Sequence, residues 1–149
     1  MHMRELIDLI DNIDLVESLA TPLEYKQTDK NQFEFQFDTP SGAKHTGMIL
    51  FHKNSSTYAS LLYEINGSFD GFNTEGFAHR ILSTVIACTL DWIKQNPKII
   101  HIGYSADKDD GTNDRRGVYQ SLTQQLSRRY GFNVVTNDPS SGEYIVQVR

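Results

Sequence analysis

A glycine-rich loop stands directly before a long apolar segment, and this arrangement suits the binding of an anion. The loop 66–76 contains three glycines, and the segment 77–95 that follows has apolar residues at helical spacing. Free N–H groups at the start of a helix attract phosphate, and glycines let the backbone approach it closely. Gly76, Phe77 and Ala78 are therefore candidate phosphate contacts, and the alternative is a tight turn that holds no ligand.

Metal-ligating side chains show no ligand spacing in this sequence. The scattered histidines are His45, His52, His79 and His101. The acidic segment 107–111 differs from a calcium loop, because its Asp spacing ahead of the glycine is wrong and no Glu closes it. We expect this segment to be a solvated loop, and we predict no metal site.

Hydrophobic periodicity defines the elements that must position the candidate residues. Apolar residues at helical spacing predict helices over 4–19, 77–95 and 115–130, and Gly131 fits the position just after the last of them. Alternating patterns and turn signals predict strands over 23–27, 32–38, 46–53, 58–65, 98–105, 132–136 and 144–148. The centre of the strand 58–65, Leu61-Leu62-Tyr63, predicts burial on both faces.

The order of these elements predicts one mixed α/β (α+β) domain over residues 1–149. The first four strands read as an antiparallel meander, and the last two as a closing hairpin. The connection from strand 58–65 through helix 77–95 to strand 98–105 is a βαβ crossover, which implies a parallel pair. A chain of 149 residues can bury a core without disulfides or metal.

Composition and charge narrow the classes of function. The net charge is -5 and the basic residues form only short pairs, so we do not expect a nucleic-acid binder. There is no signal peptide and no apolar run of about 18 residues, so we expect a cytoplasmic protein without a membrane span. The single cysteine, Cys88, excludes an intrachain disulfide, and its apolar neighbours predict a buried, inert thiol.

At the glycine loop the chain resembles the GNAT family, the acyl-CoA-dependent N-acyltransferases. Members hold the CoA diphosphate at a loop (Gln/Arg)-x-x-Gly-x-(Gly/Ala) between the fourth strand and the next helix. Gly76 and Ala78 match its last two positions, whereas Asn73 stands in place of Gln or Arg. Glu75 lies beside the expected diphosphate and lowers its electrostatic affinity.

The resemblance covers residues 23–149 as an order of elements, and it implies a GNAT-like mixed sheet. It also implies acetyl-CoA as cofactor, with its diphosphate on Asn73, Gly76, Phe77 and Ala78. The sheet would open between the strands 58–65 and 98–105, and the pantetheine would lie in that opening.

The end of the chain resembles the closing segment of the same family, in which a helix carries a Tyr and ends in Gly-Phe. In many members this Tyr protonates the departing thiolate, and Tyr119 is the match here. A pKa near 10 suits such a donor at neutral pH. A base or a water path would also be needed to take a proton from the amine, and Glu64 and His101 are the candidate bases. The alternatives are a core tyrosine, a solvent-facing carboxylate and a packed histidine.

A second resemblance, to GNAT-like proteins of tailed bacteriophages, covers residues 76–131 and implies a viral protein. It depends on a Gly-x-Ala start, residues within the next helix, a Ser-Ala after the next strand, and an Arg-x-x-Tyr in the last helix. The matching residues are Gly76, Ala78, Arg80, Thr84, Val85, Ser105, Ala106, Arg116 and Tyr119.

Two hypotheses about function follow from these resemblances. The favoured one is a non-catalytic GNAT-like protein that binds a host or viral protein or forms part of the virion, because Asn73, Glu75 and the weak acid–base set depart from an enzyme. It predicts a filled or closed cofactor cleft. The alternative is an acetyl-CoA-dependent N-acyltransferase that acts on an amine of a protein or small molecule, and it predicts an open cleft.

Overall fold

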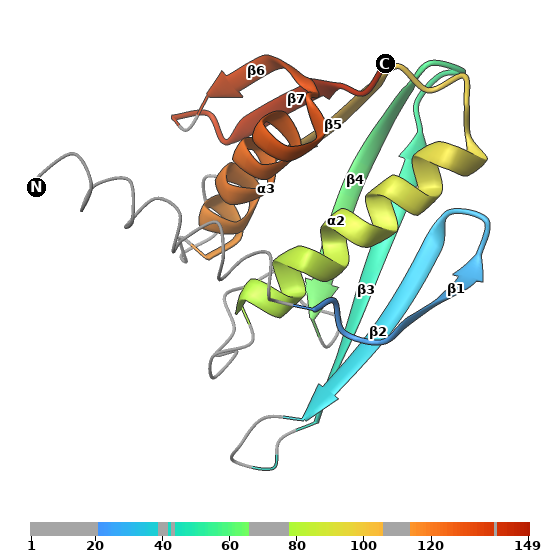
Figure 1. Ribbon diagram of the computed structural model, residues 1–149, viewed down its shortest axis with the longest axis vertical. Helices are drawn as coiled ribbons and strands as arrows, with labels where there is room; N and C mark the ends of the chain where they lie inside the picture. The colour runs from blue at the N-terminus through green and yellow to red at the C-terminus, as the bar shows by residue number, and fades with distance from the viewer. Residues whose placement is uncertain (1–20, 39–41, 43, 66–77, 106–113, 139) are drawn as a thin grey trace, which may run out of the picture.

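A computed structural model describes residues 21–38, 42, 44–65, 78–105, 114–138 and 140–149, with the side chains of 78 and 114–118 left out. These residues form a seven-stranded mixed sheet and two helices (Figure 1). The predicted mixed α/β architecture is therefore confirmed. The predicted helix 4–19 and the loops 66–77 and 106–113 lie outside the described residues.

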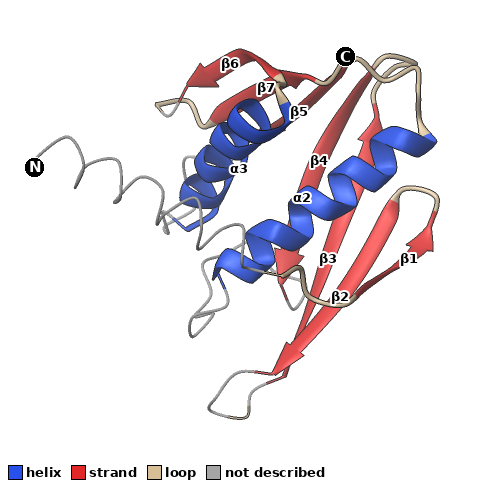
Figure 2. Cartoon of the chain, viewed as in Figure 1, coloured by secondary structure: helices blue, strands red, loops and turns tan. Residues whose placement is uncertain are grey.

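The sheet combines the predicted meander, one parallel pair and a hairpin. Strand order is β1-β2-β3-β4-β5-β7-β6, antiparallel except between β4 and β5 (Figure 2). The meander strands are β1 (Tyr25–Asp29), β2 (Gln32–Asp38), β3 (Lys44–Lys53) and β4 (Tyr58–Ile65). The remaining strands are β5 (His101–Ser105), β6 (Asn133–Asp138) and β7 (Glu143–Gln147).

Two strands begin later than their apolar residues predict, because the backbone amides before them donate to acceptors outside the sheet. The Leu23 amide donates to Thr84 Oγ1 at 2.8 Å, so β1 starts at Tyr25 and not at residue 23. The Ile99 amide donates to the Asn96 carbonyl in a turn, so β5 starts at His101 and not at residue 98.

Both helices, α2 (Ala78–Gln95) and α3 (Asp114–Tyr130), lie on the same face of the sheet (Figure 1). Gly131 has a φ of 68°, and its amide donates to the Ser127 carbonyl, so glycine ends α3 as predicted. At the end of α2, Arg149 donates to the carbonyls of Ile93 (2.6 Å) and Ile99 (2.8 Å). The C-terminal arginine therefore satisfies backbone acceptors at the helix end.

The one-sided placement of the helices corrects one prediction about β4. Leu61 and Tyr63 face the helices and are buried, whereas Leu62 faces the other side and is half-buried. The prediction of burial on both faces is wrong, because no helix in the described part of the chain covers the second face. We call this second surface the helix-free face.

Beneath α2 the core is built from phenyl and indole rings. Phe33 and Phe51 meet edge to face at 6.1 Å, and Phe51 stacks on Trp92 at 4.5 Å. The Phe35 ring lies over Gly47 in β3, where a Cβ would overlap the ring. Position 47 therefore has to be glycine for the Phe35 ring to lie there.

Candidate functional site

The sheet opens between its two parallel strands. Only three residue pairs join β4 to β5: Tyr58 with His101, Ala59 with Ile102, and Ser60 with Gly103. Beyond these pairs β4 continues to Ile65 and β5 to Ser105 without pairing to each other. We call this opening the β4–β5 gap. Unpaired backbone groups along such a gap are available to a ligand.

A cleft of about 590 Å³ lies at the β4–β5 gap. This volume is within the range of small-molecule sites. Residues of β3, β4, β5 and β7 line it, and most of the exposed lining comes from the helix-free face. The lining residues with polar side chains other than tyrosine are His52, Ser60, Ser105 and Glu143.

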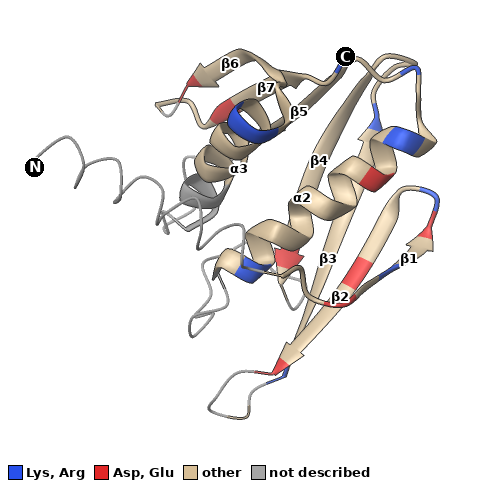
Figure 3. Cartoon of the chain, viewed as in Figure 1, with Lys and Arg blue, Asp and Glu red and all other residues tan. Residues whose placement is uncertain are grey.

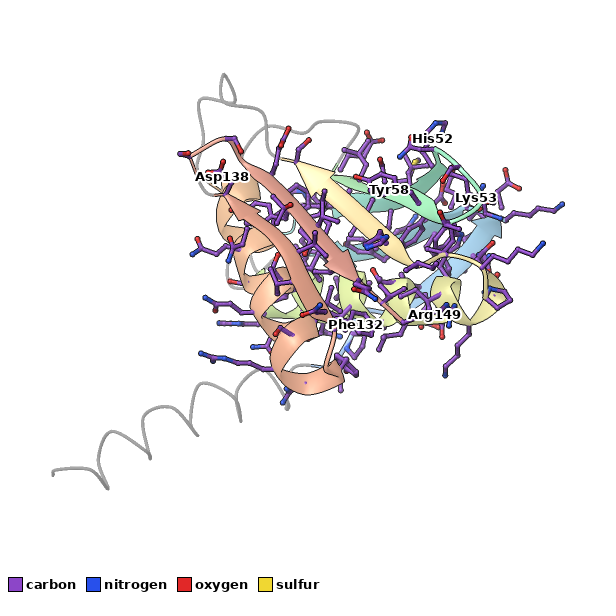
Figure 4. The ribbon with its side chains drawn as sticks, turned by 90° about the horizontal axis from the view of Figure 1, so that it is seen from above. His52, Lys53, Tyr58, Phe132, Asp138 and Arg149 are labelled. Atoms are coloured by element: carbon purple, nitrogen blue, oxygen red, sulfur yellow. The ribbon has the colours of Figure 1, made fainter. Side chains whose placement is uncertain are left out.

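One wall of the cleft depends on a glycine. A Cβ at Gly103 would overlap the hydroxyl of Tyr58, so only glycine lets this side chain lie against β5 (Figure 4). Tyr58 and Gly103 both line the cleft, so their contact forms part of its wall where the two strands are still paired.

The helix side of the gap is filled by tyrosine rings. Tyr63 of β4 meets Tyr119 of α3 edge to face at 5.6 Å, and Tyr104 of β5 lies 5.0 Å from Tyr119. Tyr104 also stacks on Tyr144 of β7 at 5.7 Å. All four side chains are buried, and we call them the tyrosine cluster. The cluster connects strands whose backbones no longer pair.

A hydrogen-bond chain fixes the central ring of the cluster. Thr123 Oγ1 donates to the Tyr119 carbonyl at 2.8 Å, so the Tyr104 hydroxyl donates to Thr123 Oγ1 at 2.6 Å. Burial raises the pKa of the Tyr104 phenol above its ordinary value, and the nearby Tyr119 and Tyr144 add to this effect. The phenol is therefore neutral at physiological pH.

The structure places the predicted proton donor and base on opposite faces of the sheet. Tyr119 is fully buried on the helix side. Glu64 is half-buried on the helix-free face, opposite Met48 of β3. His101 is half-buried at the start of β5. None of these three side chains is among the residues that line the cleft.

The predicted diphosphate contacts lie mostly outside the described residues. Asn73, Gly76 and Phe77 fall in the segment 66–77. Ala78 is the first residue of α2, and its side chain is among those left out. The diphosphate site thus stays a prediction.

Sequence reasoning missed the polar residues of the cleft and three members of the tyrosine cluster. Tyr63, Tyr104 and Tyr144 come from three strands that are distant in the sequence, so no local pattern relates them. A glycine within a strand often marks the close approach of another group. Gly103 was therefore the one local signal that pointed to the cleft.

The remaining observations on ligands concern the described residues alone. No group of three or more His, Cys, Asp or Glu side chains there is placed to hold a metal ion. No helix among them is long and apolar enough to cross a membrane.

A comparison of the chain with protein-family models, with curated proteins and with solved structures found no match.

Proposed function

We propose that this chain is a GNAT-like domain that has no acyltransferase activity and binds a host or viral protein. The order of its elements, the parallel β4–β5 pair that separates after three residue pairs, and the final hairpin support the GNAT-like layout. The observation that carries the non-catalytic assignment is the tyrosine cluster. It fills the helix side of the opening in which the resemblance places the pantetheine.

The position of the acid–base candidates supports the same proposal. A proton donor must reach the sulfur of the departing thiolate. Tyr119 is sealed between Tyr63 and Tyr104 and has no exposed surface. Glu64 lies across the sheet from it. In the described part of the chain, the predicted donor and base do not converge on one point.

The helix-free face offers the surface for a protein partner. Leu50 and Leu62 are paired neighbours on β3 and β4, and both are half-buried. Met48 and Ile145 extend this apolar surface on either side. All four side chains are only half-buried, so the surface that they leave exposed is apolar and could contact a protein partner. We assign the host or viral protein to this face.

Titration of the full chain with acetyl-CoA by calorimetry tests the non-catalytic assignment. We expect no binding heat at millimolar ligand, and no thermal shift, because the tyrosine rings fill the helix side of the opening in which the resemblance places the pantetheine. Binding with micromolar affinity would overturn the proposal. The variant Gly76→Asp, which places a carboxylate in the predicted diphosphate site, would then show whether the binding is at the expected loop.

A second variant tests the assignment of the partner to the helix-free face. Leu62→Glu changes a half-buried side chain on this face, and Ser127→Glu on α3 is the matched control on the other. Capture of a purified candidate partner should be lost in Leu62→Glu and retained in Ser127→Glu. Equal capture by both variants would remove the partner from the helix-free face.

The cleft supports a second candidate function, an acetyl-CoA-dependent N-acyltransferase that acts on an amine of a protein or small molecule. An open cleft is what this candidate predicts, and the cleft of about 590 Å³ at the gap counts against the closed cleft that the non-catalytic proposal predicts. His52, Ser60 and Ser105 supply polar contacts in it. Under this candidate, release of free thiol from acetyl-CoA would depend on an added amine. Micromolar binding of acetyl-CoA together with such release would establish it.

A further inference from the structure

Three exposed lysines lie close to the buried ring of Trp92, where α2 ends. Lys53 is the last residue of β3, and its Nζ lies 6.0 Å from the centre of the Trp92 ring. Lys94 belongs to the last turn of α2, and Lys98 follows in the turn that leads toward β5. In Figure 3 the colour of Lys and Arg gathers at this end of the molecule, where both α2 and β3 end.

A fourth exposed lysine, Lys30, comes from the turn between β1 and β2. Its neighbour Asn31 accepts the indole N–H of Trp92 at 3.0 Å. Gln27 Nε2 donates to the Lys30 carbonyl at 3.1 Å and to Gln95 Oε1 at 2.9 Å. These bonds hold the turn against the last turn of α2. We call the surface formed by the four side chains the lysine end: Lys30, Lys53, Lys94 and Lys98.

Neighbouring carboxylates do not pair with the lysine end. In the described part of the chain, none of its four ammonium groups is part of an ion pair. The two carboxylates nearby have other partners: Asp91 Oδ2 accepts the Tyr25 hydroxyl at 2.6 Å, and Asp29 Oδ1 accepts the Lys30 amide at 2.7 Å. The whole chain has a net charge of -5, so the lysine end is a local excess of positive charge on an acidic protein.

The dipole of α2 does not account for the lysine end. A cation in the last turn of a helix is stabilised by the dipole, which explains Lys94. Lys30 and Lys53 belong to the sheet and its turns, so the dipole gives no reason for them. The helix end also has its own cationic partner, because Arg149 donates to the Ile93 carbonyl at 2.6 Å. The four like charges repel one another unless an anion lies among them.

We propose that the lysine end binds an acidic peptide segment of a partner protein. Charge complementarity selects this occupant, because an ammonium group is a point charge on a flexible stem and pairs readily with a single carboxylate. The four lysines come from separate parts of the chain, so they suit several Asp and Glu side chains spaced along one segment. The inference is independent of acyl-CoA binding and of the partner on the helix-free face, since none of the four lysines lines the cleft.

A nucleic acid suits the lysine end less well than an acidic peptide. The phosphate backbone continues beyond the reach of four lysines, and the net charge of -5 on the whole chain repels the rest of such a strand. Single strands also bind by stacking their bases on exposed aromatic rings. Trp92, the ring at the lysine end, has no exposed surface and offers no such contact. A short acidic segment needs only the lysines themselves.

Fluorescence anisotropy of a labelled oligo-glutamate peptide, titrated with the full chain, tests the proposal. We expect a dissociation constant on the order of tens of micromolar in low salt, which rises as salt is added. The double variant Lys53→Glu, Lys98→Glu should raise it at least about tenfold. The matched control is Lys26→Glu, Lys44→Glu, which changes the net charge equally at exposed lysines outside the lysine end and should raise it less than about threefold. Equal losses in the two double variants overturn the proposal, as does no binding at millimolar protein in low salt.

Two further measurements cover the other occupant and a failure to fold. A single-stranded oligonucleotide with the same number of charges should bind at least about tenfold more weakly than the peptide. Tighter binding of the oligonucleotide would overturn the peptide in favour of a nucleic acid. If the charge reversals do not fold by circular dichroism, Lys94→Gln, Lys98→Gln removes two charges from exposed positions without reversing them. An unchanged dissociation constant in this variant would contradict the proposal.

Discussion

The core beneath α2 and the core beneath α3 use different aromatic residues. Under α2, Phe33, Phe51 and Trp92 pack where β2, β3 and β4 are fully paired. Under α3, tyrosines pack where β4 and β5 have separated. A phenyl ring needs only neighbours of the right shape, whereas a buried phenol also needs a hydrogen-bond partner. Beyond the last backbone hydrogen bonds between β4 and β5, packing of tyrosine side chains connects the two halves of the sheet.

Removing the indole ring from the first core should have the largest effect. Trp92→Ala loses the stack on Phe51 and the hydrogen bond from Nε1 to Asn31 Oδ1. We expect the free energy of unfolding to fall by about 3–5 kcal/mol. Urea denaturation measures this, with Tyr130→Ala, an exposed aromatic outside both cores, as the control. A loss below about 1 kcal/mol would contradict the central role of this ring.

The glycine beneath the Phe35 ring offers the next largest effect. Gly47→Ala places a Cβ inside the ring of a fully buried side chain. The surrounding core leaves the ring little room to shift, so we expect a loss of about 1–3 kcal/mol in unfolding free energy. Thermal unfolding followed by circular dichroism measures it. An unchanged midpoint would mean that the first core is less rigid than its packing indicates.

Removal of the Tyr104 hydroxyl tests the core beneath α3. Tyr104→Phe removes the hydrogen bond to Thr123 and keeps the ring, so we expect a loss of about 0.5–1.5 kcal/mol in unfolding free energy. The matched control in the first core is Phe51→Leu, which removes an aromatic contact and no hydrogen bond. A gain in stability from Tyr104→Phe would show that the bond to Thr123 does not hold the Tyr104 ring in place.

The same variant predicts a change at alkaline pH. The pKa of Tyr104 is raised in the folded chain, so the neutral phenol contributes stability that is complete below about pH 10 and is lost as the unfolded phenol ionises above it. Stability should fall less steeply above pH 10 in Tyr104→Phe than in the wild type. Urea midpoints measured from pH 8 to pH 11 give the comparison, and parallel curves would contradict it.

The smallest effect is expected where the two strands separate. Gly103→Ala pushes only the far end of the half-buried Tyr58 side chain, which can turn away from β5. We expect a loss of less than about 1 kcal/mol in unfolding free energy, smaller than that of Gly47→Ala. Nitrogen-15 chemical shifts of the residues that line the cleft should nevertheless move. A loss larger than that of Gly47→Ala would reverse the comparison.

The fold was more predictable than the site, and the reason is the range of the interactions. Alternation in Phe33, Phe35 and Phe37 defined β2 to the residue, because one face of that strand is buried and the other is not. Leu62 misled the prediction, because an apolar residue on a half-covered face looks like a core residue in sequence. The tyrosine cluster depends on contacts between residues far apart along the chain, which no spacing rule captures.

The buried thiol of Cys88 can report how often α2 separates from the sheet. Cys88 is the single cysteine of the sequence, it has no exposed surface, and burial raises the pKa of its thiol to about 12. Alkylating reagents react with the thiolate, and burial both blocks access to Cys88 and keeps its thiol protonated. The thiol therefore reacts only when α2 separates from the sheet. The labelling rate at this one position therefore measures how often α2 separates from the sheet. Cysteines introduced on the surface would be labelled first, so fluorescent probes can be attached at β6 without removing the native residue.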